Sequence, residues 1–402
     1  MSNLWKNMIW TGILQLVNLL FPLIMLPLMY NYMAIDDYGR MLAILSIAGF
    51  TVMLSDAGLT IPAVRKLARC RSSSTVFSVY FSQYVYLKIL ISTLLGAIIT
   101  FVFVRAVGDL NFVSFVLIIF LIVAQSVTPY VIFQSLEVNK KLAKIVLLSK
   151  MFFVLPLGWI LLSVYGSVGA IIFAYLVGNV FVLVCSYYSF FSLGYRLTRA
   201  KFYLAWLMFI KSKGYFFSRM AVASYTKGNT ALVSILLGPE ASALFGTADK
   251  IYTAMRSVYM PVSNALYPYI SNSQNFKLFK VPFIAVSVFN IVAVIGSWLT
   301  LSLLSERFAL IEISISIIPY FLVALLFVVP SILIGYPLLG AAGYGNLVNK
   351  STYWGAITYY ITLSFWFFFI NQSLQGFLLA IIFTEIFVLF YRIFNCRRLK
   401  LL

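Results

Sequence analysis

Cations that interrupt otherwise apolar stretches are the residues best suited to chemistry in this sequence. Five of them stand inside stretches that are long enough to cross a membrane: Lys88, Lys150, Arg219, Lys227 and Arg256. A charge at the centre of a bilayer costs about 2.5 to 3.5 kcal/mol on insertion scales, so it normally faces a cavity or an oppositely charged partner. These cations therefore predict a polar site that attracts an anionic ligand.

Three carboxylic acids, Asp56, Asp249 and Glu385, stand in similar surroundings. Glu385 has no charged residue before it as far as Ser351, and none after it until Arg392. Because an isolated buried charge is costly, Glu385 must be paired or protonated. Asp56 and Asp249 fall near predicted helix ends, where capping is an alternative role. The sequence has no histidine, so any proton transfer falls to these carboxylates.

Helical spacing gathers several of these residues on single faces. At about 100° per residue, a helix centred near residue 259 carries a polar stripe about 40° to either side of one line. The stripe consists of Asp249, Thr253, Arg256, Ser263 and Tyr267. The preceding helix carries Arg219, Ala223, Thr226, Thr230 and Ser234 on one face, with Lys227 beside it. Near the N-terminus, Gln15 and Asn18 precede Pro22, which can loosen a helix lining a cavity.

Each of these cations has a structural alternative. Lys150 and Arg219 fall near helix ends, where long side chains reach out to the lipid headgroups. Lys88, Lys227 and Arg256 lie deeper in their helices, so their alternative is a structural ion pair. The sequence alone leaves these alternatives open.

The composition shows what kind of elements must position these residues. Of the 402 residues, 63% are hydrophobic and 10% are charged, whereas soluble domains carry about 25% charged residues. This excludes a soluble enzyme and a disordered chain, and the long unalternated apolar runs exclude an outer-membrane barrel. Three scattered cysteines predict neither disulfides nor a metal site. We expect an all-α polytopic membrane protein without metal, cofactor or nucleic-acid partner.

The apolar runs predict about twelve membrane-spanning helices, since one crossing uses roughly 20 residues. We place their centres approximately at residues 20, 49, 91, 123, 154, 178, 227, 259, 293, 324, 361 and 384. The runs starting at Met151 and Ser351 are too long for one crossing and must fold back, near residues 163–169 and 371–376.

The distribution of Lys and Arg predicts the orientation, because these residues are retained in short cytoplasmic loops. With the N-terminus inside, 20 of the 29 fall in cytoplasmic segments, five in spans and four outside. The four are Arg40, Arg105, Lys250 and Arg307. Both termini are therefore predicted to be cytoplasmic.

A long basic connection in mid-chain predicts two halves of six helices each. We place an N-terminal lobe at residues 1–191, a basic cytoplasmic linker at 192–213 and a C-terminal lobe at 214–402. Paired halves of this kind place binding sites near the midplane in many transporters.

Several segments resemble a known family. Residues 225–230 (YTKGNT), 237–251 (LGPEASALFGTADKI) and 260–271 (MPVSNALYPYIS) resemble helices 7 and 8 of bacterial O-antigen flippases. Residues 36–39 (DDYG) and 54–59 (LSDAGL), with Arg65, are similar to the region of helices 1 to 3 in the same proteins. These flippases are members of the multidrug/oligosaccharidyl-lipid/polysaccharide exporter superfamily.

The resemblance implies a multi-pass protein of the bacterial inner membrane, with two lobes around a cationic central cavity. Its cargo would be an undecaprenyl-pyrophosphate-linked O-antigen repeat unit for lipopolysaccharide biosynthesis, moved from the cytoplasmic to the periplasmic leaflet by alternating access. Partners would be membrane lipid, an O-antigen polymerase, a chain-length regulator and a coupling H⁺ or Na⁺.

On this basis we assign two sets of site residues and no catalytic residue. The substrate-binding cavity would contain Lys88, Arg219, Lys227, Arg256, Gln15 and Asn18. Asp56, Asp249 and Glu385 would be coupling or gating carboxylates.

Two other functions fit parts of the sequence. Asp36 and Asp37 in an external loop are the kind of acidic pair used by membrane glycosyltransferases and O-antigen polymerases. The external loops are too short for the acceptor domain that such enzymes need, so we expect no enzyme. The other alternative is a peptidoglycan-precursor flippase or drug exporter of the same superfamily, although drug exporters expel cations and favour acidic cavities.

Overall fold

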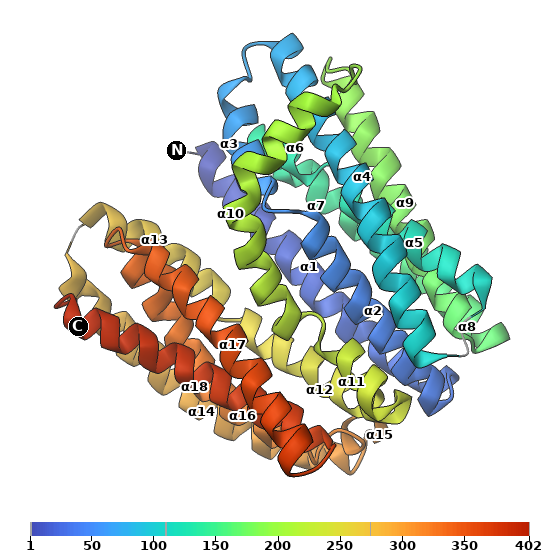
Figure 1. Ribbon diagram of the computed structural model, residues 1–402, viewed down its shortest axis with the longest axis vertical. Coiled ribbons are helices and arrows are strands. Elements are labelled where there is room, and N and C mark those ends of the chain that lie inside the picture. Colours follow the sequence, from blue (N-terminus) through green and yellow to red (C-terminus); the bar gives the residue numbers. More distant parts are fainter. Residues whose placement is uncertain (1, 109–110, 274, 402) are drawn as a thin grey trace. The chain divides into compact units, whose positions relative to one another are not determined.

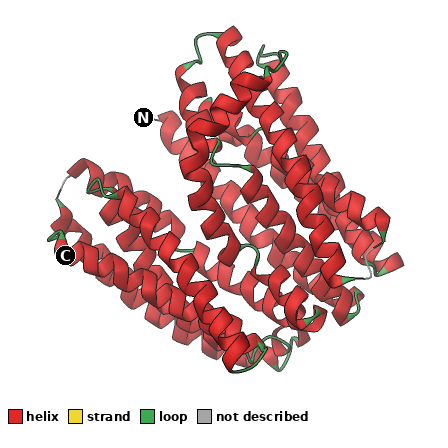
Figure 2. Ribbon diagram, viewed as in Figure 1, coloured by secondary structure: helices red, strands yellow, loops and turns green. Residues whose placement is uncertain are grey.

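The computed structural model describes residues 2–108, 111–273 and 275–401. Over these ranges every regular element is a helix and no strand occurs (Figure 2). A helix satisfies its backbone hydrogen bonds internally, which is what allows it to cross hydrocarbon without a neighbouring strand. The predicted all-α fold is confirmed.

The chain forms two compact units, Met1–Ala223 and Ser224–Leu402 (Figure 1), in agreement with the two lobes that the sequence predicts. The predicted linker at 192–213 is helical from Phe202 onward. Along the chain, the boundary between the two units falls ten residues beyond the end of this linker. The exact bounds of the predicted lobes stay a prediction.

Unit 1 begins with four helices that carry most of its predicted site residues. They are α1 (Ser2–Tyr32), α2 (Ile35–Ser55), the short basic helix α3 (Thr60–Arg69) and α4 (Ser74–Val107). The unit continues with α5 (Phe112–Val127), α6 (Tyr130–Ser135), α7 (Asn139–Leu148), the π-helical η1 (Ser149–Val154), α8 (Leu155–Tyr165), α9 (Val168–Ser192) and most of α10 (Phe202–Thr226).

Prolines explain two irregularities in unit 1, because proline lacks the backbone N–H that continues a helix. Pro129 separates α5 from α6, and Pro156 follows the π-helical turn that joins α7 to α8. Gly166 adopts a left-handed conformation (φ 56°) at the end of α8. The chain therefore folds back there, within the predicted turn at 163–169.

Unit 2 contains α11 (Asn229–Leu237), α12 (Pro239–Ser257), α13 (Met260–Ser273), the 3₁₀ turn η2 (Phe276–Phe279) and α14 (Lys280–Ser305). It ends with α15 (Ala309–Glu312), α16 (Ile318–Leu333), the π-helical η3 (Ile334–Gly340), α17 (Gly345–Phe369) and α18 (Leu374–Arg398). The gap between α17 and α18, residues 370–373, overlaps the second predicted turn at 371–376. Helix α18 packs against α16 and α17 around a core that includes Phe321, Tyr359 and Phe377.

Nine helical segments within the described ranges are long and apolar enough to span a membrane. They coincide with nine of the twelve predicted spans. The other three predicted spans, near residues 227, 259 and 361, correspond to α10 with α11, α12 with α13, and α17. The first two are broken helices that bring polar residues into the span, a feature that bears directly on the site.

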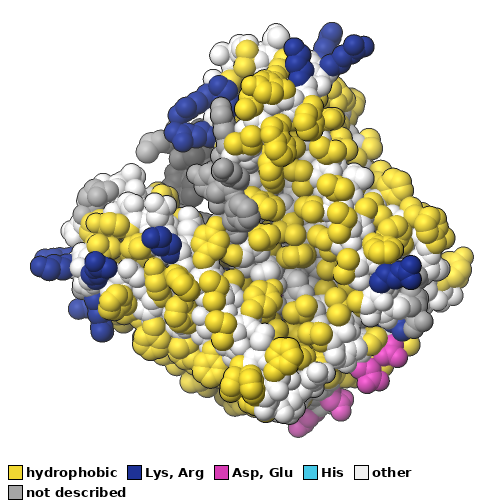
Figure 3. All heavy atoms as spheres, in the orientation of Figure 1, with side chains coloured by type: hydrophobic (Ala, Val, Ile, Leu, Met, Phe, Trp, Pro, Cys, Tyr) yellow, Lys and Arg dark blue, Asp and Glu magenta, His cyan; other side chains and the backbone are white. Residues whose placement is uncertain are grey.

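Apolar side chains cover the flanks of the helices, whereas Lys and Arg gather toward helix ends (Figure 3). Helix α14 shows this most clearly, with Val281, Ile284, Val288, Val292 and Leu299 all exposed. Exposed aliphatic residues over the whole length of a helix are typical of a surface that faces lipid.

Candidate functional site

The predicted site residues of unit 1 include a buried ion pair. Lys88 Nζ donates to Asp56 Oδ1 at 3.1 Å, and both side chains are buried. The Thr60 hydroxyl also donates to Asp56 Oδ1, and Lys88 lies over the Tyr84 ring at 5.9 Å. The pair joins the middle of α4 to the residue that ends α2. The structure thus brings together two residues that the sequence assigned separately to cavity and coupling roles.

Gln15 and Asn18 both lie on α1 and are exposed. Asn18 Oδ1 accepts a hydrogen bond of 2.7 Å from Lys150 Nζ, which also lies 4.9 Å from the centre of the Phe21 ring. Lys150 is therefore fixed to α1 by polar and cation–π contacts. The side chain of Arg219, on α10, lies outside the described part of the structure.

In unit 2, Lys227 stands in the break between α10 and α11. Helix α10 ends at Thr226, and α11 begins at Asn229. Asn229 Nδ2 donates to the carbonyl of Tyr225 at 2.7 Å, so a side chain takes a backbone acceptor near the end of α10. The sequence predicted one helix centred on this position. Lys227 therefore lies where the helix is interrupted, and its side chain is exposed.

Arg256 lies in the last turn of α12, directly before a second break, where α12 ends at Ser257 and α13 begins at Met260. Pro261 cannot donate the backbone bond that would continue the helix, and Tyr259 N bonds instead to the Arg256 carbonyl at 3.3 Å. The continuous polar stripe predicted for one helix is therefore wrong. Asp249, Thr253 and Arg256 lie on α12, whereas Ser263 and Tyr267 lie on α13.

Four predicted residues of unit 2 form one charged cluster: Lys227, Asp249, Arg256 and Glu385. The charge of Asp249 interacts with Lys250, Lys227 and Arg256, and that of Glu385 interacts with Arg256. Among the described residues, Asp249, Arg256 and Glu385 make no direct ion pair. Arg256 is therefore able to form contacts with an anionic ligand.

Arg392 is a buried cation beside the charged cluster, and the sequence analysis did not assign it to the site. It lies two turns after Glu385 on α18, interacts with the Glu385 charge, and donates to Ser331 O at 2.7 Å and Ser351 Oγ at 2.9 Å. The positive-inside rule predicts a cytoplasmic segment that holds Arg392 together with Arg397, Arg398 and Lys400. The seven-residue spacing from Glu385, which places both on one helix face, was the available signal.

Buried polar atoms without a partner lie beside the charged cluster. Within the described residues, the hydroxyls of Tyr252 and Tyr359 and Oδ1 of Asn229 have no hydrogen-bond partner. Tyr252 interacts with the Asp249 and Arg256 charges, and Tyr359 packs on Tyr225 with ring centres 6.0 Å apart. Such buried groups in proteins normally find water or a ligand. The cluster therefore offers cations and unused polar groups together.

No group of three potential metal ligands occurs in the described part of the chain, and the three cysteines are free. Asp37, from the acidic pair that suggested a glycosyltransferase, has Arg40 as a neighbour at 3.6 Å.

Comparison with known sequences identifies relatives over most of the chain. Residues 4–274 match the family described as "Polysaccharide biosynthesis protein". A protein of Shigella dysenteriae named "Putative O-antigen transporter" is 22% identical over 324 residues, which cover 76% of this chain and 79% of that protein. A protein of Escherichia coli K12 with the same name is 22% identical over 325 residues, covering 78% and 76%.

Solved structures share the fold. The lipid II flippase MurJ in an inward-closed conformation has a TM-score of 0.65 at 16% identity, with 90% of this chain and 86% of MurJ covered. A eukaryotic MATE transporter has a TM-score of 0.63 at 14% identity, with 98% and 94% covered. The described helices, the apolar spans and the match to residues 4–274 agree: this chain is a multi-pass protein of the bacterial inner membrane and belongs to the polysaccharide biosynthesis protein family.

Proposed function

We propose that the protein is a flippase for an undecaprenyl-pyrophosphate-linked O-antigen repeat unit. It would carry the unit from the cytoplasmic to the periplasmic leaflet by alternating access. Support comes from the family match and from the two relatives named as O-antigen transporters. Such a cargo combines a pyrophosphate and sugars, which must leave water, with a lipid tail that stays in the bilayer.

The observation that carries the proposal is the placement of Lys227 and Arg256 at two helix breaks. A helix interruption inside a membrane is tolerated where the freed backbone groups line a polar site. Lys227 and Arg256 both interact with Asp249, so they belong to one site in unit 2. Charge-assisted hydrogen bonds to phosphate oxygens are about twice as strong as neutral ones, which suits these residues to a pyrophosphate.

The remaining predicted residues fall into supporting roles. Arg219, Gln15 and Asn18 stay candidates for further cargo contacts. For Lys88, the ion pair with Asp56 favours a structural role, in which it would hold α2 against α4. The unpartnered Tyr252 and Tyr359 hydroxyls are suited to sugar hydroxyls or to the water around them.

Glu385 and Asp249 are the proposed coupling carboxylates. Glu385 is buried near two cations, Arg256 and Arg392. Binding of an anionic cargo at Arg256 would weaken the attraction between Arg256 and Glu385 and so favour proton uptake by the acid. A proton or Na⁺ gradient could then bias the cycle. Partners would be an O-antigen polymerase and a chain-length regulator, which act on the flipped cargo.

Deletion in the native strain tests this proposal. We expect the deleted strain to accumulate lipid-linked repeat units that face the cytoplasm and to lose long surface polysaccharide. An O-antigen polymerase, the competing enzyme, would instead leave single unpolymerised units on the cell surface. Loss of peptidoglycan synthesis with normal O-antigen would favour a peptidoglycan-precursor flippase, and unchanged polysaccharide with increased drug sensitivity would favour a drug exporter.

A further inference from the structure

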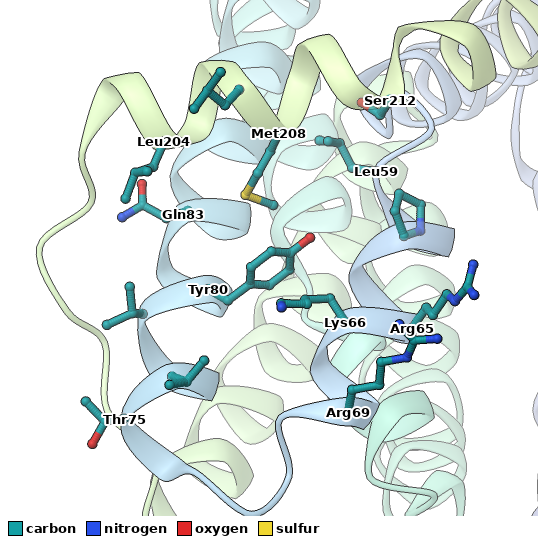
Figure 4. Close-up of a pocket in the computed structure, with 14 residues that line it drawn as sticks. Leu59, Arg65, Lys66, Arg69, Thr75, Tyr80, Gln83, Leu204, Met208 and Ser212 are labelled. Atoms are coloured by element: carbon teal, nitrogen blue, oxygen red, sulfur yellow. The ribbon is translucent and has the colours of Figure 1, made fainter.

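Unit 1 contains a pocket of about 780 Å³ that has no part in the proposed cargo site. Three elements form it: α3, the first turns of α4 and the first turns of α10 (Figure 4). The lining residues that the structure describes fall between Leu59 and Ser212, which places the pocket in unit 1.

One wall of the pocket is cationic. Arg65, Lys66 and Arg69 all lie on the side of α3 that lines the pocket, and all three are exposed. Figure 4 shows the Lys66 side chain extending toward the Tyr80 ring. On the other side of α3, Ala63 and Leu67 are fully buried.

These three cations have no carboxylate partner among the residues that the structure describes. Among the described residues that line the pocket, none is acidic. In the part of the chain that the structure describes, neither Arg65, Lys66 nor Arg69 forms an ion pair with a carboxylate. By contrast, the nearby Arg71 is paired with Glu137 at 2.9 Å. The pocket wall therefore presents three positive charges to a ligand.

The other walls are mostly aliphatic. They are built from Leu59, Pro62, Val76, Val79, Leu204, Leu207 and Met208. Val76 and Val79 are exposed and lie at the start of α4, which is one of the membrane-spanning segments. The pocket thus joins a cluster of cations to an apolar surface at the end of a membrane helix.

Hydrogen bonds hold the pocket in shape. The chain between α9 and α10 runs along α4, where three backbone N–H groups donate to α4 side chains. Arg196 N bonds to Ser78 Oγ at 3.1 Å, Thr198 N to Ser82 Oγ at 2.9 Å and Lys201 N to Gln83 Oε1 at 2.9 Å. These bonds fix the start of α10, and with it Leu204 and Met208, over the first turns of α4.

We propose that this pocket binds the phosphate headgroup of an anionic membrane phospholipid. The phosphate would contact Arg65, Lys66 and Arg69, and an acyl chain would lie along the aliphatic walls. Basic pockets beside membrane helices are suited to anionic headgroups, because the cations meet the phosphate at headgroup depth. An inorganic phosphate would use the cations and leave the aliphatic walls in water, so the chemistry favours the lipid.

Native mass spectrometry of the purified full-length protein tests this proposal with phosphatidylglycerol as the probe. We expect phosphatidylglycerol to bind more tightly than phosphatidylcholine. Each cation should contribute about fivefold to its affinity, the effect of one Lys or Arg near a membrane surface. Replacing Arg65, Lys66 and Arg69 together by Gln should therefore weaken binding by about a hundredfold. Val79→Trp, which adds bulk to an aliphatic wall of the pocket without changing its charge, should weaken binding as well.

The matched control replaces Arg397, Arg398 and Lys400 by Gln, since these are two exposed arginines and one exposed lysine in unit 2. The control should keep wild-type affinity, and a thermal unfolding scan should show that all variants are folded. Equal losses in the control and the pocket variant would overturn the proposal, because binding would then depend on net charge alone. Inorganic phosphate that competes fully with the lipid at equal concentration would also overturn it, since the lipid tail would contribute nothing.

Discussion

Lys88 and Asp56 form a buried ion pair, with 3.1 Å between Nζ and Oδ1, that links the middle of α4 to the end of α2. Removing one partner would leave an unpaired buried charge, which costs about 3 to 5 kcal/mol. We expect Lys88→Met and Asp56→Asn each to lower the thermal stability of the purified protein strongly. The double variant should be more stable than either single variant, because it removes both charges.

Thermal unfolding in detergent, with transport measured on the same preparations, distinguishes a structural role from a direct one. If Lys88→Met is as stable as the wild type and yet inactive, Lys88 contacts the cargo and the structural role is wrong.

Glu385 is the carboxylate for which a role in energy coupling can be tested most simply. Gln has the shape and hydrogen-bonding capacity of the neutral acid but cannot titrate. If Glu385 couples transport to protons, Glu385→Gln should fold normally and lose its response to a pH gradient imposed across proteoliposomes. A variant that responds to the gradient like the wild type would assign Glu385 a structural role and leave Asp249, Asp56 or another ion for coupling.

Gly335 leaves room for the buried Arg392 guanidinium. A Cβ atom at this position would lie 2.9 Å from Arg392 Nη1, which is held by Ser331. Gly335→Ala should therefore destabilise the protein, by about 1 to 3 kcal/mol for an overpacked site. Gly296→Ala is the matched control, because a Cβ there would meet no atom within 4 Å. Equal thermal stability of the two variants would show that Arg392 moves aside freely.

The positive charges of the loops predict which ends of the helices face the cytoplasm. In a background in which the three native cysteines are replaced, single cysteines at Ser74 and Ser273 should be protected from a membrane-impermeant thiol reagent in intact cells. Cysteines at Gly166 and Ser373 should react. The reverse pattern at two or more of these positions would contradict the predicted orientation.

The sequence was sufficient to predict helical spans and their turns. The apolar run that starts at Met151 is too long for one crossing, so its length alone predicts that the chain folds back near residues 163–169. Gly166 provides the left-handed conformation at that turn. Isolated charges in apolar runs likewise make Lys227, Arg256 and Glu385 candidate site residues, because a charge within an apolar run can be recognised from the sequence alone.

Partners and helix breaks could not be predicted in the same way. Lys88 and Asp56 are 32 residues apart, and only the packing of α2 on α4 brings them together. The burial of Arg392 could not be predicted, because its hydrogen-bond partners Ser331 and Ser351 lie on other helices. The break before Met260 interrupts a regular polar spacing that, by periodicity alone, is indistinguishable from a continuous helix.

The proposed function depends most directly on cargo movement mediated by Lys227 and Arg256. The measurement is flipping of the lipid-linked repeat unit in proteoliposomes, detected as sugar in the inner leaflet becoming accessible to a membrane-impermeant glycosidase. One lost charge-assisted hydrogen bond is worth about 1.5 to 3 kcal/mol, so Arg256→Ala and Lys227→Ala should slow flipping at least about tenfold. Arg256→Lys should retain part of the activity, and the exposed-cation control Lys280→Ala should be fully active. Flipping at the wild-type rate by both Arg256→Ala and Lys227→Ala would contradict the proposed site.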